Sequence, residues 1–469
     1  MIEKSFDRIM RAGTAIVLAA SLFSCLSSSP QDGESVDTSA SVAAEDQAGG
    51  LFDRRFSQAE LQADFTELQR LITMYHPKLY TDREAIERLS EENYGRIRDG
   101  MTELDFYRLL APIVASLNCG HSSISLSQPS LARLHAEGVF FPLPLYLVGR
   151  RAFITMQGFD AEISPGAEIL SINGRSMATI IEELFDSMCS DGTNETYKYM
   201  INRADGFMYW YRYLLDDDTV YEIAYRNGDG GEVSTTRLSA ATMAEINHKN
   251  PEPRGRDQPP CSTAFTETYA LIRFAAFYPQ GVYTIAKYKQ FIDDFFRKVM
   301  DSGIPTVILD VRDNFGGDPN VTSHLFSYLA RTSQPYFSHD SPSYYPGLKN
   351  PVPLAANRFR GRLITLMNGL SFSSTGHLLA LLKYQDIGTF VGEESGGSFA
   401  CTDSSQDFYL PNTRLRFRSS TQIWLVATEG LTPGRGIMPD HAASVSVEDY
   451  LAGRDVVMEY AVTLAETGE

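Results

Sequence analysis

The strongest constraint on the fold is a repeated unit in which a short apolar strand passes through a glycine-containing turn into a helical pattern. The run Thr306–Val311 leads into Asp313-Asn-Phe-Gly-Gly317, and Leu363–Met367 leads into Asn368-Gly369 and a serine cluster. A third short strand is expected at Gly388–Gly392. Strands and helices that alternate in this way predict an α/β layered core, and ligands of such cores bind at the carboxyl ends of the strands.

The segments before this core have other patterns. From Ser57 to Leu117 apolar residues recur at three- and four-residue steps, which predicts helices, and Ser57 with Glu60 forms a candidate capping box. Short strand-like pieces follow, and Asn227-Gly-Asp-Gly230 predicts a hairpin. The predicted organisation is a helical N-terminal region (52–130), a β-rich module (138–245), a proline-containing linker (246–262), the α/β core (263–447) and a C-terminal helix (448–469).

The first residues predict export. Basic residues precede an apolar run that is too short to span a bilayer, which is the pattern of a signal peptide over residues 1–24. Leu22-Phe-Ser-Cys25 resembles a bacterial lipobox, so Cys25 is the predicted lipid attachment site; a signal peptide that happens to contain a cysteine is the alternative. Residues 25–51 are small and polar and predict a flexible tether. We therefore expect a lipid-anchored protein of the bacterial cell envelope that faces the periplasm.

The charge balance excludes one class of partner. The chain has 41 Lys and Arg against 59 Asp and Glu, a formal net charge of −18. Binding to nucleic-acid phosphates rests on clustered basic residues, so we expect no nucleic-acid partner. The five cysteines form no metal-binding pattern, and we predict neither a metal nor another cofactor. Disulfide pairing and oligomeric state cannot be read from the spacing.

The sharpest candidate for chemistry is the serine cluster at the second strand-to-helix junction, Asn368-Gly-Leu-Ser-Phe-Ser-Ser-Thr-Gly-His377. A serine at the start of a helix lies beside free backbone N–H groups, which can stabilise a developing oxyanion. The alternative is that these hydroxyl residues only cap the helix, a role in which they are favoured.

The first junction, Asp310-Val-Arg-Asp-Asn-Phe-Gly-Gly317, carries two glycines that allow backbone N–H groups to approach a ligand closely. Because the two junctions belong to neighbouring strand-helix units, their N–H groups could point at one site. A plain glycine turn is the alternative. We interpret Asp310 and Arg312 as a structural pair rather than as an acid and a base.

A serine nucleophile needs a base that takes its proton. Among the eight histidines, His121 closes a helix and opens a strand in a Gly-His-Ser-Ser turn, which makes it the preferred candidate. A purely structural histidine is the alternative, and His377 and His441 are rivals within the core.

Together these motifs resemble those of the C-terminal processing (tail-specific) serine peptidases and their tricorn-core relatives. The similarity extends from about Leu104 to Val447, with the motifs in the order that the family has them. The matching segments are Gly120-His-Ser122, Pro165-Gly-Ala-Glu-Ile-Leu-Ser-Ile-Asn-Gly174, Ile308-Leu-Asp-Val-Arg-Asp-Asn-Phe-Gly-Gly317, Asn368-Gly-Leu-Ser-Phe-Ser-Ser374, Gly392-Glu-Glu-Ser-Gly-Gly397 and Gly436-Ile-Met-Pro-Asp440.

The resemblance implies a crotonase-like layered α/β catalytic core and a PDZ-like module at 138–245. Such a module either captures the end of an extended peptide or covers the core. The resemblance also implies Ser373 as the nucleophile, with the backbone amides of Gly316 or Gly317 and of Ser374 as the oxyanion hole.

Two positions place the chain nearer the tricorn-core-like branch of the family, which lacks the catalytic lysine. In the branch with a serine-lysine dyad the lysine stands where this chain has Ser398, and no lysine follows Lys383, so the dyad is excluded. The tricorn-core-like branch uses a histidine base, which fits His121, and orients that histidine through a glutamate. Pro433 occupies the expected glutamate position, and Glu429 is our substitute.

We therefore predict an exported serine peptidase that hydrolyses a peptide or protein through an acyl-enzyme on Ser373, with His121 as general base. The main alternative is an inactive protein on the same scaffold that binds a peptide or an apolar ligand. An enzyme acting on acyl thioesters is a third hypothesis, from fold analogy alone. The substrate sequence and the choice between endo- and exo-cleavage cannot be read from the chain.

Overall fold

The computed structural model describes residues 54–156, 163–203, 205–249 and 259–468. The predicted signal peptide, Cys25 and the predicted tether lie outside the described residues, as does the middle of the predicted linker. Among the described residues no helix is long and apolar enough to cross a membrane.

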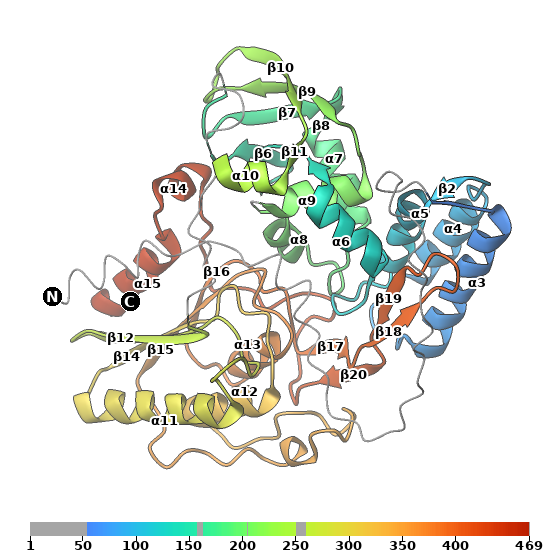
Figure 1. The fold of residues 1–469 in the computed structure, drawn as a ribbon. Helices are drawn as coiled ribbons and strands as arrows, with labels where there is room; N and C mark the ends of the chain where they lie inside the picture. Colours follow the sequence, from blue (N-terminus) through green and yellow to red (C-terminus); the bar gives the residue numbers. More distant parts are fainter. Residues whose placement is uncertain (1–53, 157–162, 204, 250–258, 469) are drawn as a thin grey trace.

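The α/β core is built on a six-stranded sheet (Figure 1). The edge strand β12 (Cys261–Phe265) is antiparallel to β13 (Tyr269–Phe274), and all further neighbours pair in parallel. The order continues with β14 (Thr306–Asp310), β15 (Arg362–Met367), β16 (Thr389–Gly392) and β21 (His441–Ala442). The predicted α/β fold class is confirmed, and the carboxyl ends of β14 and β15 lie side by side.

Helices cover both faces of this sheet, because its central strands are apolar on both sides. Val307 and Leu309 of β14 pack with α11 (Ile285–Ser302), α12 (Pro319–Leu329) and α13 (Ser374–Tyr384). Ile308, which points to the opposite face, packs with α15 (Val456–Thr467). The core therefore has three layers, and Figure 1 shows α11 and α15 on its two sides.

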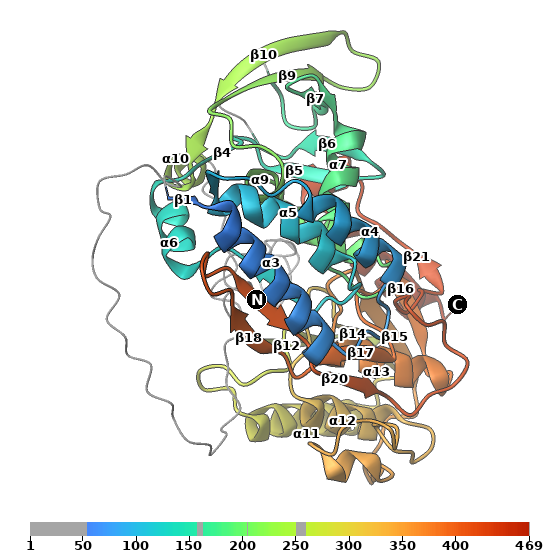
Figure 2. The same cartoon turned by 90° about the vertical axis from the view of Figure 1, so that its right-hand side faces the viewer.

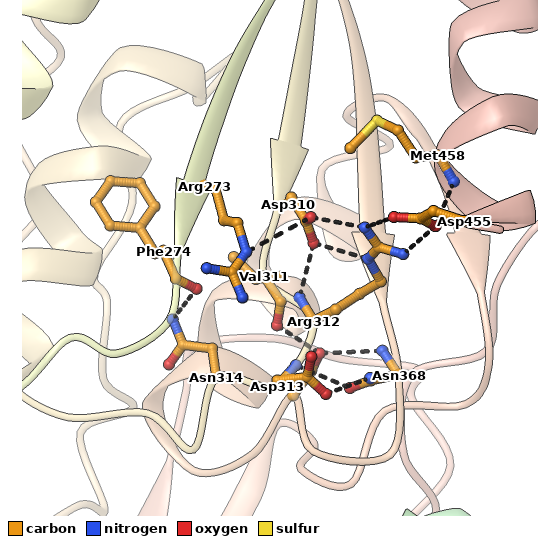
Figure 3. A network of polar contacts seen from close by, with 11 residues as sticks. Arg273, Phe274, Asp310, Val311, Arg312, Asp313, Asn314, Asn368, Asp455 and Met458 are labelled. Atoms are coloured by element: carbon orange, nitrogen blue, oxygen red, sulfur yellow. Dashed lines mark hydrogen bonds and ion pairs between the residues drawn. The ribbon is translucent and has the colours of Figure 1, made fainter. Parts of the chain in front are cut away.

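The C-terminal segment forms two helices. Gly453, in the left-handed conformation at φ 66°, ends α14 (Val447–Ala452), and the side chain of Asp455 caps α15. Arg312, directly after β14, donates to Asp310 and to Asp455 (Figure 3). The ion pair of Arg312 with Asp455 attaches α15 to the sheet. The ion pair of Arg312 with Asp310 confirms the structural interpretation of these two residues.

The N-terminal region is helical, as predicted, and consists of α3 (Gln58–Tyr75), α4 (Arg83–Tyr94) and α5 (Glu103–Ala115). The capping box of Ser57 and Glu60 is present at the start of α3. After α5 the chain turns through His121 into β3 (Ser123–Ser125), which pairs with β19 (Arg416–Ser419). The hairpin of β18 (Gln406–Tyr409) and β19 thereby joins this turn to the C-terminal half of the core (Figure 2).

The β-rich module has a main sheet in the order β10-β9-β7-β6-β5. Its strands are β5 (Leu145–Val148), β6 (Arg151–Ile154), β7 (Glu168–Ile172), β9 (Val220–Arg226) and β10 (Val233–Ser239). The hairpin that Asn227-Gly-Asp-Gly230 predicts is formed by β9 and β10. The apolar side chains of this module and of the N-terminal helices form one continuous core.

Shorter elements complete the described chain. They are β1 (Arg55–Phe56), β2 (Met101–Thr102), α6 (Gln128–Glu137), β4 (Val139–Phe140), β8 (Arg175–Ser176), α7 (Met177–Asp186), α8 (Thr196–Ile201), α9 (Asp205–Leu214), β11 (Ala241–Thr242), α10 (Met243–Lys249), the 3-10 helix η2 (Pro346–Lys349), β17 (Ala400–Asp403) and β20 (Gln422–Leu425).

Removing the carboxylate of Asp455 should loosen the attachment of α15. Burial raises the pKa of Asp455, but the hydrogen bonds and charge of Arg312 outweigh it and hold the pKa below its ordinary value. This contribution to stability is present at neutral pH and is lost as the pH falls through that lowered pKa. We expect Asp455→Ala to lower the free energy of unfolding at pH 7 by about 2–4 kcal/mol in guanidinium titrations, because it leaves a buried arginine short of a partner.

Asp294→Ala is the matched control, since Asp294 pairs with Arg297 at the exposed surface of α11. This variant should unfold near the wild-type midpoint. Equal stability of Asp455→Ala and wild type would show that the pair does not hold α15.

Candidate active site

Asn314 joins the two strand-to-helix junctions. Its side chain is fully buried, and Oδ1 accepts hydrogen bonds from the Gly316 N–H at 2.9 Å and the Thr375 hydroxyl at 2.9 Å. Its backbone carbonyl accepts from Phe372 N–H at 3.0 Å, and its Nδ2 donates to the carbonyl of Phe274 (Figure 3). One residue therefore sets the distance between the glycine turn after β14 and the serine turn after β15.

A second set of contacts joins the same turns. The side-chain amide of Asn368 accepts from Asp313 N–H and donates to Asp313 Oδ1 (Figure 3). The hydroxyl of Ser371 donates to the carbonyl of Val311 at 2.8 Å. Two asparagines and one serine of the predicted motifs thus have structural roles, and Ser373 is the next serine along the chain.

Ser373 has the geometry of a presented nucleophile. Its backbone lies at φ 55° and ψ −127°, which non-glycine residues rarely adopt and which costs about 1–3 kcal/mol. The residue stands immediately before α13, is partly exposed, and its Oγ makes no hydrogen bond to another described residue. The capping interpretation of this serine is wrong, because its side chain does not cap the helix.

Gly316 lies directly against this turn. A Cβ on Gly316 would stand 2.7 Å from Ser373 Cβ and 2.9 Å from Ser374 N, and the residue has φ 97°. Only glycine fits here. The two turns therefore meet backbone to backbone.

The candidate oxyanion donors differ in whether their N–H group is already donated to another residue. The N–H of Gly316 is already donated to Asn314, so this amide is not available to a ligand. The N–H groups of Gly317 and Ser374 donate to no other group among the described residues. Of the alternatives from the sequence, Gly317 and Ser374 are therefore the residues whose N–H groups are not engaged by described groups.

The motif segments 392–397 and 436–440 support this turn. A Cβ on Gly397 would stand 2.8 Å from Ser373 N, and Gly397 N–H donates to the carbonyl of Ser371. Glu394 accepts two hydrogen bonds from Arg435 and a third from the N–H of Gly436. The segments 392–397 and 436–440 are therefore interlocked and support the serine turn.

His121 reaches the site from the N-terminal half of the chain. Its ring stacks on Phe372, the residue before Ser373, with centroids 4.5 Å apart and planes at 27°. Its Nε2 lies 3.9 Å from Asp403 Oδ2, and its Nδ1 is buried with no partner among the described groups. No hydrogen bond joins His121 to Ser373 Oγ in the described structure.

His377 and His441, the alternative candidates for the base, have surroundings that differ from those of His121. His377 is buried one helical turn after Ser373, its Nε2 is 3.4 Å from Cys401 Sγ, and burial lowers its pKa to about 3. His441 lies on β21, where its Nδ1 is hydrogen-bonded to the hydroxyl of Tyr460. Neither makes a hydrogen bond to Ser373 Oγ.

Glu429 is exposed and makes no hydrogen bond or ion pair with another described residue. The structure does not bring it to His121. The carboxylates near the imidazole come instead from Asp403 on β17 and from Asp191, which accepts the N–H of Gly120 at 2.7 Å. Sequence reasoning missed both, because Asp191 lies in the stretch assigned to the β-rich module and no motif marks Asp403.

Ser398, at the position of the family lysine, is buried and its hydroxyl has no partner among the described groups. The Nζ of Lys198 donates to the carbonyl of Phe185 at 2.7 Å and makes no hydrogen bond to Ser373. Across the described ranges no group of three or more His, Cys, Asp or Glu could hold a metal ion.

A strained serine at a helix start, free amides beside it and a histidine packed on its neighbour are the parts that a serine hydrolase needs. Residues 268–443 match the profile of Peptidase family S41. This match confirms the predicted resemblance to the C-terminal processing serine peptidases, and it covers most of the α/β core.

Two solved structures have the same overall fold. A structure of mature CPAF complexed with lactacystin has a TM-score of 0.62 at 13% identity, and covers 87% of this chain and 98% of its own. A second structure of mature CPAF has a TM-score of 0.62 at 12% identity, with coverages of 87% and 96%. The photosystem II D1 C-terminal processing protease matches with a TM-score of 0.41 at 15% identity, with coverages of 85% and 98%. No curated protein matches the chain.

Placing a methyl group on Gly316 should separate the two turns. We expect Gly316→Ala to lower the rate of covalent labelling by a fluorophosphonate probe at least about 100-fold, a loss of the size seen when one oxyanion donor is removed. Gly347→Ala is the matched control, because a Cβ there meets nothing within 4 Å. Labelling of both variants at the wild-type rate would contradict the close contact of the turns.

Proposed function

We propose that this protein is a serine peptidase that forms an acyl-enzyme on Ser373, with His121 as general base. The observation that carries the proposal is the conformation of Ser373. Its strained backbone presents a partly exposed Oγ with no hydrogen-bond partner among the described residues, and the N–H groups of Gly317 and Ser374, in the two turns that meet here, are not donated to any described group. Strain of this kind persists where the surroundings fix it, and it is concentrated at functional sites.

The position of His121 supports its role as base. Its ring stacks on Phe372, the residue directly before Ser373. In unliganded enzymes catalytic hydrogen bonds are often long and shorten only when substrate binds. We therefore propose that the hydrogen bond from Ser373 Oγ to the imidazole forms when a peptide occupies the site.

We propose the following reaction. His121 takes the proton of Ser373 Oγ as this oxygen attacks the peptide carbonyl, and the N–H groups of Gly317 and Ser374 hold the oxyanion. The C–N bond breaks, and the imidazolium returns its proton to the leaving amine. Water, activated by the same imidazole, releases the acid and restores Ser373. Glu429 has no part in this proposal because it is exposed and contacts no other described polar group.

The proposal is tested by covalent labelling, which needs no known substrate. We expect a fluorophosphonate to label the wild type, Ser373→Ala to abolish the labelling, and His121→Gln to slow it about 10²–10⁴-fold through loss of the base. His441→Gln is the matched control and should react like the wild type, because His441 bonds to Tyr460 away from the serine turn.

The alternative, an inactive binding protein on this scaffold, is favoured by the missing hydrogen bond between His121 and Ser373 Oγ. It predicts that purified wild type takes up no probe but retains a peptide or an apolar ligand. Labelling that persists in Ser373→Ala would contradict the assignment of the nucleophile.

We also propose that the mature protein is exported and anchored by a lipid on Cys25. The support is the basic and apolar start of the chain, Leu22-Phe-Ser-Cys25 and the polar segment that follows. Expressed in bacteria with radiolabelled palmitate, the wild type should carry label and sediment with membranes. Cys25→Ser should carry none and appear in the soluble fraction; label retained in this variant would contradict the anchor.

A further inference from the structure

Asp191 lies directly behind the turn that carries His121. Its carboxyl is buried, with 5% of the residue exposed, and Oδ1 accepts the N–H of Gly120 at 2.7 Å. Gly120 immediately precedes His121, and a Cβ on Gly120 would stand 3.3 Å from the same oxygen. The aspartate therefore fixes the peptide unit between Cys119 and Gly120, one residue before His121.

Two buried polar atoms at this place have no partner. They are Oδ2 of Asp191 and Nδ1 of His121, and neither bonds to any described group. Buried polar atoms in native proteins are nearly always paired, so the unpaired oxygen of Asp191 and the unpaired ring nitrogen of His121 call for an explanation. Burial raises the pKa of Asp191 to about 6, and its attraction to His121 opposes that rise. Above that pH the aspartate supplies a negative charge.

The loop that carries Asp191 is fastened on both sides of the site. Gly192 N–H donates to the carbonyl of Asn118 at 2.9 Å, Thr193 N–H donates to the carbonyl of Gly434 at 3.0 Å, and the side chain of Asn194 donates to the carbonyl of Ser395 at 2.8 Å. A Cβ on Gly192 would stand 2.2 Å from the carbonyl oxygen of Gly434. Asp191 is thus held in place by the N-terminal half and by the core together.

We propose that Asp191 is the positioning carboxylate of His121: it holds the Gly120–His121 turn through Oδ1, and its negative charge keeps a proton on Nδ1 and stabilises the imidazolium. This inference rests on the proposed function and adds to it that Nε2 is the nitrogen that takes the Ser373 proton. Asp191 stays ionised throughout, and the proton passes only between Ser373, His121 and the leaving amine.

Asp403 is the rival carboxylate. It lies 3.9 Å from Nε2, on the other side of the ring, but its side chain is 40% exposed, so solvent weakens its effect on the imidazole. Its Oδ1 also accepts a hydrogen bond from Ser405. The remaining titratable groups around His121 and Asp191 are Tyr80, Cys119, His377 and Cys401.

The experiment compares Asp191→Asn, Asp403→Asn and Asp293→Asn. An asparagine at 191 retains an oxygen for Gly120 N–H but replaces Oδ2 with a neutral NH₂ group, which removes the negative charge behind the turn that carries His121. We expect Asp191→Asn to slow fluorophosphonate labelling about 10²–10⁴-fold and to move the acid limb of the rate-pH profile down by about one pH unit. A purely structural defect would lower the rate without moving this limb.

The two other variants separate the carboxylates. Asp403→Asn should change the rate less than tenfold, and Asp293→Asn, which alters the distant pair of Asp293 with His324, should leave it unchanged. A large loss in Asp403→Asn together with a small one in Asp191→Asn would overturn the inference in favour of Asp403.

A second measurement needs neither activity nor a variant at 191. In ¹⁵N spectra of histidine-labelled wild type, the signals that disappear in His121→Gln should report a proton on Nδ1 at neutral pH. A proton on Nε2 instead would overturn the inference. If the wild type takes up no probe, the proposed function fails, and these spectra still decide the role of Asp191.

Discussion

The structure depends on the buried side chain of Asn314. With Oδ1 it binds both the glycine turn after β14 and the first turn of α13, and with its backbone carbonyl it holds the N–H of Phe372. These bonds help to offset the cost of the backbone conformation at Ser373. They also engage the N–H of Gly316, whereas the N–H of Gly317 is donated to no described group. Asn314 therefore holds the two turns together and decides which glycine N–H stays free.

The site is completed by residues that lie far from the core in sequence. His121 follows α5 and lies against the serine turn because β3 joins the hairpin β18–β19 and because its ring packs on Phe372. The loop with Asp191 belongs by sequence to the β-rich module, yet its hydrogen bonds run to Asn118, Gly434 and Ser395. The N-terminal helices and this module share one core, so this half of the molecule carries His121 and its surroundings as one packed body.

Much of this could be predicted from the sequence, because local patterns determine it. Apolar runs that end in glycine turns predicted the sheet and the edge at which its two turns meet. Ser57 with Glu60 predicted the start of α3. Contacts between distant segments could not be read. Spacing along the chain predicted Glu429 as the carboxylate that orients the histidine. The structure leaves Glu429 exposed and buries Asp191 behind Gly120. The engagement of Gly316 N–H by Asn314 was also invisible, since it depends on the fold of a turn and not on a spacing.

The central claim is that the hydroxyl of Ser373 is a nucleophile. The most direct measurement is peptide mapping by mass spectrometry after the purified wild type has reacted with a fluorophosphonate. We predict one phosphonate per chain, on the peptide that contains Ser373 and at that residue within it. A phosphonate on another residue, or an unmodified protein after prolonged reaction, would contradict the account.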